Sequence, residues 1–324
     1  MKKTDFTSFR SYLLRSFTKT FPNRNYLLME SMIYLMIIAK VKGVYDNLKT
    51  NQDWIDYAIS IEKEFYNRFG YTLETFKYIK NNDYNTLKNP FEYIKLKKFN
   101  FDFNLYLPKK NSLYITKNKY GYCNEEEFDK TEYIADDYLG FTYQFFLSQY
   151  EKSIMQSNCS YYTSTETIDS LLKEHFSDAN KIYDPFCGTG RIGFADLYKH
   201  PILSGSDIDK TAVDLANLNH WLLNLNPNDD FSRFYHEDFY EIKEQHDYIF
   251  TNIPFSKSVK TEAEILNKIE TMTYNKAVVI IPRGHFERMQ QYLNNKNWKF
   301  EKPLNKDEFQ PFTGAMGEVV SILL

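Results

Sequence analysis

Residues 7–85 place apolar side chains at helical spacing. In residues 27–38 the apolar positions share one face of a 3.6-residue repeat, and Gly43 is a typical helix end. Asn51–Asp53 can cap a second helix that ends at Gly70. A helical bundle of this kind carries no chemistry of its own, so it is interpreted as a packing or partner-docking region.

Residues 86–122 change to a two-residue alternation. Apolar and polar side chains alternate over Phe99–Leu107, which is typical of a half-buried strand, and residues 108–116 can turn and return as a hairpin. Lysine dominates the charged positions of this stretch. The hairpin is therefore either a local nucleic-acid surface or a solvated edge that lysines protect, and both interpretations stay open.

The acidic, polar segment 125–136 predicts a boundary, and strands then alternate with helices. The predicted strands are 181–184, 202–206, 233–236, 247–251, 276–281 and 318–324, and the predicted helices are 137–155, 166–175, 191–200, 211–224 and 261–270. This order predicts an α/β fold with a doubly wound, Rossmann-like sheet. We expect a helical N-terminal domain over 1–130, with a basic β-hairpin near 95–120, and the α/β domain over 131–324.

The first of these strands leads into a glycine-rich bend. Asp184 stands at the strand end, and Gly188 and Gly190 allow a tight turn and a close backbone approach to a ligand. Backbone N–H groups and a helix N-terminus at such a loop can hold an anionic or polar group. Taken alone, the loop also fits an ordinary strand-to-helix turn, because short glycine motifs often match by chance.

Three further strand ends carry polar or aromatic groups. Asp207 lies about 20 residues beyond the glycines, the spacing at which an acid accepts two ribose hydroxyls. His236–Phe239 follows the third strand and Asn252–Phe255 follows the fourth. Four such strand ends in order are hard to explain by chance, and they indicate a ligand site at the carboxyl ends of the strands.

Here the chain resembles a known family. The run Asp184–Gly190, Asp-Pro-Phe-Cys-Gly-Thr-Gly, resembles the S-adenosylmethionine loop of N6-adenine DNA methyltransferases. Asn252–Phe255, Asn-Ile-Pro-Phe, resembles their catalytic Asn-Pro-Pro-Tyr/Phe tetrapeptide. Tyr161–Ser164 resembles the Phe-Tyr-Thr-Pro motif of the modification (M) subunits of type I restriction-modification systems, and Asp137–Leu147 resembles the helix before it.

The resemblance implies a methyltransferase domain that binds S-adenosylmethionine. Asp207 would accept the ribose hydroxyls, and Asp238 would accept the adenine amino group. Phe239 would pack on the adenine ring, although it can equally be plain core, and Thr163 would reach the methionine carboxylate. The other expected cofactor-binding residues are Tyr162, Asp184, Phe186, Gly188, Gly190 and Ile208.

The resemblance also implies methyl transfer to the exocyclic N6 of adenine in DNA, with the base flipped out of the duplex. The side-chain carbonyl of Asn252 and the backbone carbonyl of Ile253 would accept the two N6 hydrogens. Pro254 would stiffen the turn, and Phe255 would stack on the base. Ile253 stands where the DNA family has Pro, and rRNA adenine dimethylases carry Asn-Ile/Leu-Pro-Tyr/Phe. The cofactor loop and the Tyr162 motif favour DNA.

Charge and composition qualify this interpretation. The formal net charge is −3, without the basic bias that nucleic-acid binders often show, so a partner or a local surface would supply the phosphate contacts. Three scattered cysteines predict neither a disulfide framework nor a zinc site. With no apolar signal segment and no membrane span, we expect a cytoplasmic protein that uses no metal.

The residues after Phe255 are used up by the closing strands, which leaves no room for a large target-recognition domain. We therefore expect a separate specificity subunit, or low sequence specificity. Two alternatives stay open. One is a methyltransferase acting on RNA adenine N6 or on a protein glutamine N5, and the other is a catalytically inactive subunit that only binds the cofactor.

Overall fold

The computed structural model describes residues 26–73, 76, 139–140, 143, 163–192, 202–222, 233–256, 258–309 and 316–324. The chain divides into two compact units, Met1–Tyr150 and Glu151–Leu324. The predicted boundary between residues 130 and 131 and the basic hairpin near 95–120 lie outside the described residues, so both stay predictions.

Two helices dominate the described part of the first unit. Helix α2 spans Tyr26–Val41, and Gly43 after it has a φ of 71°, as expected for a helix end. The short η1 covers Tyr45–Asn47, and α3 covers Asn51–Phe69 before Gly70, whose φ is 76°. The predicted cap of α3 was wrong. Thr50 caps this helix, because its side chain and that of Asp53 bond each other's backbone N–H groups.

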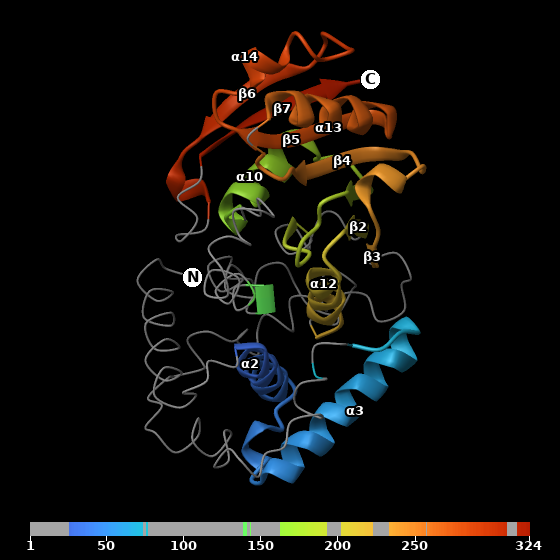
Figure 1. Cartoon of the computed structure of the whole chain (residues 1–324), viewed down its shortest axis with the longest axis vertical. Helices are drawn as coiled ribbons and strands as arrows, with labels where there is room; N and C mark the ends of the chain where they lie inside the picture. Colours follow the sequence, from blue (N-terminus) through green and yellow to red (C-terminus); the bar gives the residue numbers. More distant parts are fainter. Residues whose placement is uncertain are drawn as a thin grey trace. The chain divides into compact units, whose positions relative to one another are not determined.

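A seven-stranded sheet forms the described core of the second unit, in the order β3-β2-β1-β4-β5-β7-β6 (Figure 1). Strands β1 to β5 run parallel, and β7 pairs antiparallel with β5 and β6. The strands are β1 (Lys181–Asp184), β2 (Ile202–Asp207), β3 (Phe234–His236), β4 (His246–Asn252), β5 (Thr273–Pro282), β6 (Lys299–Leu304) and β7 (Gly317–Leu323). The helices are α10 (Thr165–His175), α12 (Lys210–Leu222), α13 (Val259–Thr271) and α14 (Phe286–Met289), with short turns η5 (Phe239–Glu241) and η6 (Lys306–Glu308).

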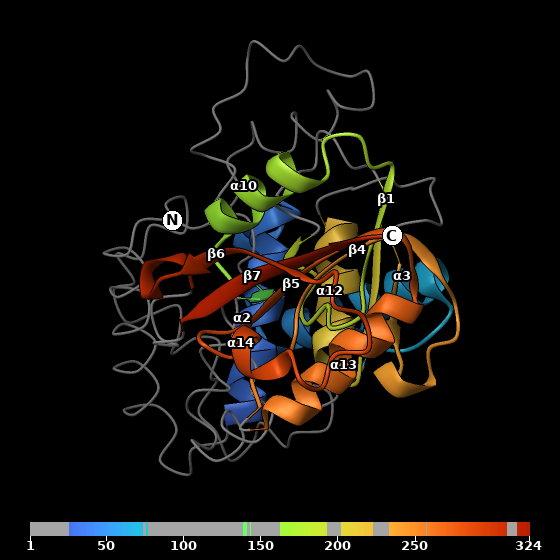
Figure 2. The same ribbon diagram turned by 90° about the horizontal axis from the view of Figure 1, so that it is seen from above.

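Apolar side chains pack on both faces of this sheet, which confirms the doubly wound α/β prediction. Along β5, Val278 and Ile280 belong to the core that includes residues of α10 and α12, whereas Val279 and Ile281 belong to the core that includes residues of α13. Figure 2 shows α10 and α13 on opposite sides of the strands. A continuous apolar run is what a strand buried on both faces requires.

Two elements were missed from the sequence, β6 and α14. Strand β6 is an edge strand whose residues are mostly exposed, so its pattern of lysine, glutamate and aromatic residues carries little apolar periodicity. Helix α14 has only four residues, too few for a 3.6-residue repeat to appear. The predicted helix at 191–200 is described only at its first two residues.

Gly205 in β2 lets the loop after β1 cross the sheet closely. It pairs with Asp184 of β1, and the backbone N–H of Cys187 donates to the Ser206 carbonyl at 2.9 Å. A Cβ at position 205 would overlap the Asp184 carbonyl oxygen and lie 2.8 Å from Cys187 Cβ. The absence of a side chain at this position therefore fixes where the loop runs.

We expect Gly205→Ala to push this loop off β2. Overpacking against backbone costs about 1–3 kcal/mol of unfolding free energy, so thermal or urea unfolding should show a clear loss of stability. Ser204→Ala, one position earlier in the same strand, is the matched control and should change little. Equal stability of the two variants would contradict the close crossing.

Candidate active site

The strand order reverses between β1 and β4, and the site lies where these two strands end. The chain runs outward from β1 through β2 to β3 and then returns to β4 on the other side of β1. Open α/β sheets bind ligands in the crevice at such a switch point. The Thr251 hydroxyl of β4 donates to Asp184 Oδ1 of β1 at 2.6 Å, which ties the two strand ends together.

The glycine loop after β1 is held by the carboxylate that ends β2. Asp207 accepts the Gly188 N–H at 2.8 Å on one oxygen and the Asp209 N–H at 2.8 Å on the other. Gly190 has a φ of 78°, and a Cβ there would lie 3.0 Å from Ala216 Cβ in α12. Gly188 and Gly190 are thus needed for the turn itself, as the sequence predicted for a tight loop.

Two carboxyl groups at this edge have pKa values that are raised toward neutral pH. Burial raises the pKa of Asp184 to about 7, although bonds from Thr251 and the Phe186 N–H favour its ionised form. Removal from water likewise raises the pKa of Asp207 to about 6, against the bonds from Asp209 and Gly188. Each carboxylate also disfavours ionisation of its neighbours, so added hydrogen-bond donors would stabilise the charged forms.

The end of β3 carries the residues expected near a cofactor adenine. Asp238 caps η5 by accepting the Tyr240 N–H at 2.9 Å. Phe239 is buried in the core, and its ring packs on that of Phe186 with centroids 4.6 Å apart. Ile208 is 68% exposed beside Asp207, so its apolar side chain is accessible to a ring.

The tetrapeptide follows β4 directly. Asn252 Nδ2 donates to Thr163 Oγ1 at 3.1 Å, so the predicted cofactor residue and the predicted catalytic residue touch. Ile253 is buried, and its N–H donates to the Ile280 carbonyl of β5 at 3.2 Å. Phe255 is half-buried and meets Phe309 edge to face, with centroids 5.9 Å apart. Tyr162 lies outside the described residues.

Sequence reasoning missed two residues of this site. Thr251 was hidden in the β4 pattern, although its position just before Asn252 places its side chain on the opposite face of the strand. Arg191 follows the glycine loop and is buried, and its Nη1 lies 3.5 Å from the Thr163 carbonyl oxygen. The available signal was a charged residue at the first position of the predicted helix 191–200.

Within the described parts of the chain, no group of three or more His, Cys, Asp or Glu side chains is placed to hold a metal ion. No helix among those residues is long and apolar enough to cross a membrane.

Comparison with known families now bears on this site. The model of the N-6 DNA methylase family matches residues 134–289, which include the glycine loop, the strand ends and the tetrapeptide. The match spans just under half of the chain, and over that part the chain is similar to the N-6 DNA methylase family. The resemblance inferred from the motifs is confirmed, and the protein is an S-adenosylmethionine-dependent methyltransferase. A search of curated proteins found no match.

Solved structures show only distant likeness. A protein from Vibrio vulnificus assigned as a modification subunit of a type I restriction enzyme is 18% identical; the match covers 60% of this chain and 50% of that one, at a TM-score of 0.40. A Plasmodium falciparum dimethyladenosine transferase is 17% identical over 49% of this chain and 60% of its own, at a TM-score of 0.39. Magnesium protoporphyrin IX methyltransferase from Synechocystis is 11% identical over 48% and 77%, at 0.40. Nothing about substrate follows from likeness at this level.

The residues of the edge fit S-adenosylmethionine. A carboxylate ends β2 and another follows β3, matching the hydroxyl and amino donors of an adenosine. The glycine loop after β1, whose Gly188 N–H bonds Asp207, has no side chain at Gly188 that would obstruct a close approach. Asp207 accepts the Gly188 N–H of the loop on one oxygen and the Asp209 N–H on the other, so ribose hydroxyls would add to bonds that already hold it in place.

Cofactor affinity should depend on pH through Asp207. Ribose hydroxyls donate to the ionised carboxylate, so binding should be strongest above the pKa and fall by up to about tenfold per pH unit below pH 6. Titration calorimetry with S-adenosylhomocysteine from pH 5 to 8 measures this. Asp207→Asn should bind more weakly and lose most of the dependence, leaving the part due to Asp184.

Asp209→Asn is the matched control for this test. Asp209 accepts the Thr211 N–H at 2.9 Å at the start of α12, and asparagine preserves that contact. The control should keep the wild-type affinity above pH 7 and the wild-type shape of the pH profile, with the fall in binding shifted toward acid because loss of the Asp209 charge lowers the Asp207 pKa. A flat wild-type profile, or one that rises toward acid, would contradict the role given to Asp207.

Proposed function

We propose that this protein transfers the methyl group of S-adenosylmethionine to the exocyclic N6 of adenine in DNA. The observation that carries the proposal is the place of Asn252, which ends β4 beside the switch point and touches Thr163. The tetrapeptide it begins lies within the N-6 DNA methylase match, as does the glycine loop. Cofactor and methyl acceptor would then meet across one strand end.

The acceptor nitrogen needs two hydrogen-bond acceptors. The N6 lone pair is delocalised into the ring, and acceptors on both N6 hydrogens favour its tetrahedral, nucleophilic form. The Nδ2 of Asn252 donates to Thr163, so we assign the acceptor role to the side-chain oxygen of Asn252. The Ile253 carbonyl would supply the second acceptor. Positioning and charge stabilisation of this kind can provide most of the rate.

The backbone around the acceptors is fixed by β5. Ile253 is almost fully buried, and its N–H donates to the Ile280 carbonyl, so the turn after β4 continues the strand pairing. Pro254 then locks φ and removes a donor that would compete for the base. A carbonyl at position 253 serves the proposed role whether the side chain is proline or isoleucine.

S-Adenosylmethionine supplies an electrophilic methyl group on a sulfonium. Asp207 would orient the ribose, Asp238 would accept the adenine amino group, and Thr163 would contact the methionine carboxylate. Arg191, buried next to Thr163, adds positive charge near that carboxylate. The N6 nitrogen would gain the methyl group as the methyl–sulfur bond breaks and leaves a neutral thioether, and it would release one proton, which water can accept.

RNA is the second candidate substrate, and Ile253 is the residue that favours it. The Asn-Ile-Pro-Phe order fits the tetrapeptide of rRNA adenine dimethylases at all four positions, whereas the DNA family has Pro at position 253. The Asp-Pro-Phe-Cys-Gly-Thr-Gly loop and the Tyr162-Thr163 motif favour DNA. Both candidates use the same acceptors, so only the nucleic acid that becomes labelled distinguishes them.

We further propose that a separate specificity subunit presents the DNA. The sequence motif at 161–164 resembles that of type I modification subunits, and the formal net charge of −3 leaves the chain without a general basic bias. Counterion release by lysine and arginine dominates DNA affinity, so an uncharged or acidic chain gains from a basic partner. Methylation that rises when a specificity subunit is added would support this arrangement.

Asn252→Ala tests the proposed chemistry. It should lower methyl transfer to DNA about 100-fold or more, because one of two groups that stabilise the reacting amine is lost. Cofactor affinity should stay within about threefold, since the ribose and adenine contacts are on other strands. Labelled-methyl transfer followed by nucleoside analysis, with calorimetry for the cofactor, gives both values.

Asn275→Ala is the control, because Asn275 is an exposed asparagine near the start of β5, at the opposite end of that strand from the site. It should leave transfer unchanged. If Asn252→Ala abolishes cofactor binding, or retains full transfer, the catalytic role of Asn252 is wrong.

Phe255→Ala should weaken capture of the flipped base. Loss of one aromatic stacking partner costs about 1–3 kcal/mol, so KM for DNA should rise about 5- to 150-fold. Phe255→Tyr keeps the ring and should retain most of the activity. Steady-state kinetics on one DNA substrate measure both variants, and an alanine variant with unchanged KM would remove Phe255 from the acceptor pocket.

A further inference from the structure

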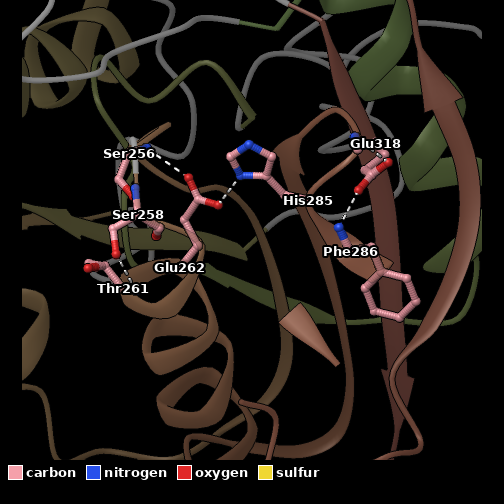
Figure 3. Close-up of polar contacts among 8 residues, drawn as sticks. Ser256, Ser258, Thr261, Glu262, His285, Phe286 and Glu318 are labelled. Carbon is pink, nitrogen blue, oxygen red and sulfur yellow. Dashed lines mark hydrogen bonds and ion pairs between the residues drawn. The ribbon is translucent and has the colours of Figure 1, made fainter. Parts of the chain in front are cut away.

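A buried carboxylate lies directly beyond the tetrapeptide. Glu262, in the first turns of α13, has no exposed surface. Its Oε1 accepts the Ser256 N–H at 2.9 Å, and its Oε2 accepts from His285 Nδ1 at 2.6 Å. Figure 3 shows the carboxylate between the Ser256 backbone and the His285 imidazole. Glu262 therefore bridges the segment after β4 and the segment after β5.

The segment that carries His285 is itself fixed by a second carboxylate. Glu318 of β7 is buried and accepts the Gly284 N–H at 2.9 Å and the Phe286 N–H at 2.6 Å. Gly284 and Phe286 are the residues directly before and after His285 in the chain, and Figure 3 shows the bond from Phe286 to Glu318. The imidazole thus projects from a turn whose backbone is bonded to the sheet, which makes it a firm anchor for Glu262.

Ser256 is held on its other side by the start of α13. Its hydroxyl donates to the Ser258 carbonyl at 2.9 Å and accepts the Ser258 N–H at 3.0 Å. Ser258 in turn caps α13 by accepting the Thr261 N–H. Side-chain hydrogen bonds therefore fix the backbone after Phe255, and the Glu262 contact links it to the segment after β5.

Because Glu262 is buried, removal of one of its two hydrogen-bond partners is destabilising. A buried carboxylate without partners costs several kcal/mol, whereas two donors offset that cost. Burial raises the pKa of Glu262, and the bonds from His285 and Ser256 favour its charged form. Loss of His285 would leave a buried carboxylate with one partner fewer and weaken its hold on Ser256.

We propose that Glu262 and His285 are positioning residues for the methyl acceptor. They fix Ser256, and through it the orientation of Phe255, without contacting the cofactor or the base. This inference rests on the proposed function for the identity of the acceptor, but the link itself is a property of the chain. The cofactor contacts on β1, β2 and β3 lie outside it.

Three variants test the link. Glu262→Met removes both acceptor oxygens at similar volume, and His285→Phe removes the donor while keeping a ring. His285→Asn places an amide N–H where Nδ1 stands and should preserve the contact. Glu264→Met, at an exposed position of the same helix whose carboxylate is 3.9 Å from Lys260 Nζ, is the matched control.

The kinetic readout separates positioning from general destabilisation. In Glu262→Met and His285→Phe, kcat/KM for DNA should fall at least about tenfold, while the dissociation constant for S-adenosylhomocysteine stays within about twofold. His285→Asn and Glu264→Met should remain close to wild type. A folded Glu262→Met or His285→Phe with unchanged kcat/KM, or with an equal loss of cofactor affinity, would overturn the proposal.

Hydrogen exchange gives a readout that does not need the substrate. The Ser256 amide should exchange at least about tenfold faster in His285→Phe than in wild type, with the Gly188 amide unchanged. Unchanged exchange at Ser256 would overturn the positioning role. If the wild-type protein methylates no DNA, but the Ser256 amide still exchanges faster in His285→Phe than in wild type, the proposed function is wrong. The link from Glu262 to Ser256 is then still supported.

Discussion

The hydrogen bonds between β2 and the loop after β1 are the interaction on which the site depends. Asp207 bonds the Gly188 N–H, the Ser206 carbonyl bonds the Cys187 N–H, and Gly205 leaves the space through which the loop passes. Each contact joins the loop to one strand, so the loop cannot move without unpairing from β2. The same carboxylate that the cofactor would use is therefore already employed in building its binding surface. Substitution of Asp207 should therefore affect both the position of the loop and the affinity for the cofactor.

The second constraint is the reversal of strand order between β1 and β4. It places the ends of β1 and β4, which are distant in sequence, side by side. The Thr251 hydroxyl can therefore donate directly to Asp184. Loop and tetrapeptide belong to different strands, so each is fixed by its own neighbours. The loop is held by β2, and the tetrapeptide is held by β5 and by the Glu262 link. If the proposed roles hold, a substitution at one strand end should disturb cofactor binding or the acceptor without disturbing the other.

The features that could be predicted from the sequence are those that depend on residues close together in the chain. The buried strands, the helix end at Gly43, the turn glycines and the acid that ends β2 were all readable, because each depends on residues near it in sequence. The bond between Thr251 and Asp184 joins residues 67 apart, and the bond between Glu262 and His285 joins residues 23 apart. No periodicity encodes such partners. Edge strand β6 was missed because solvent exposure removes the apolar signal, and the α3 cap was misplaced by one residue because Thr50 and Asp53 act as a pair.

The most direct test of this account is a crystal structure of the protein with S-adenosylhomocysteine. We predict ribose hydroxyls on the Asp207 carboxylate, the Gly188 bond retained, the adenine beside Ile208 and Asp238, and the sulfur facing Asn252. Ligand density elsewhere, or a ribose bound without Asp207, would contradict the claim that the strand ends of β1, β2 and β4 form one methyl-transfer site.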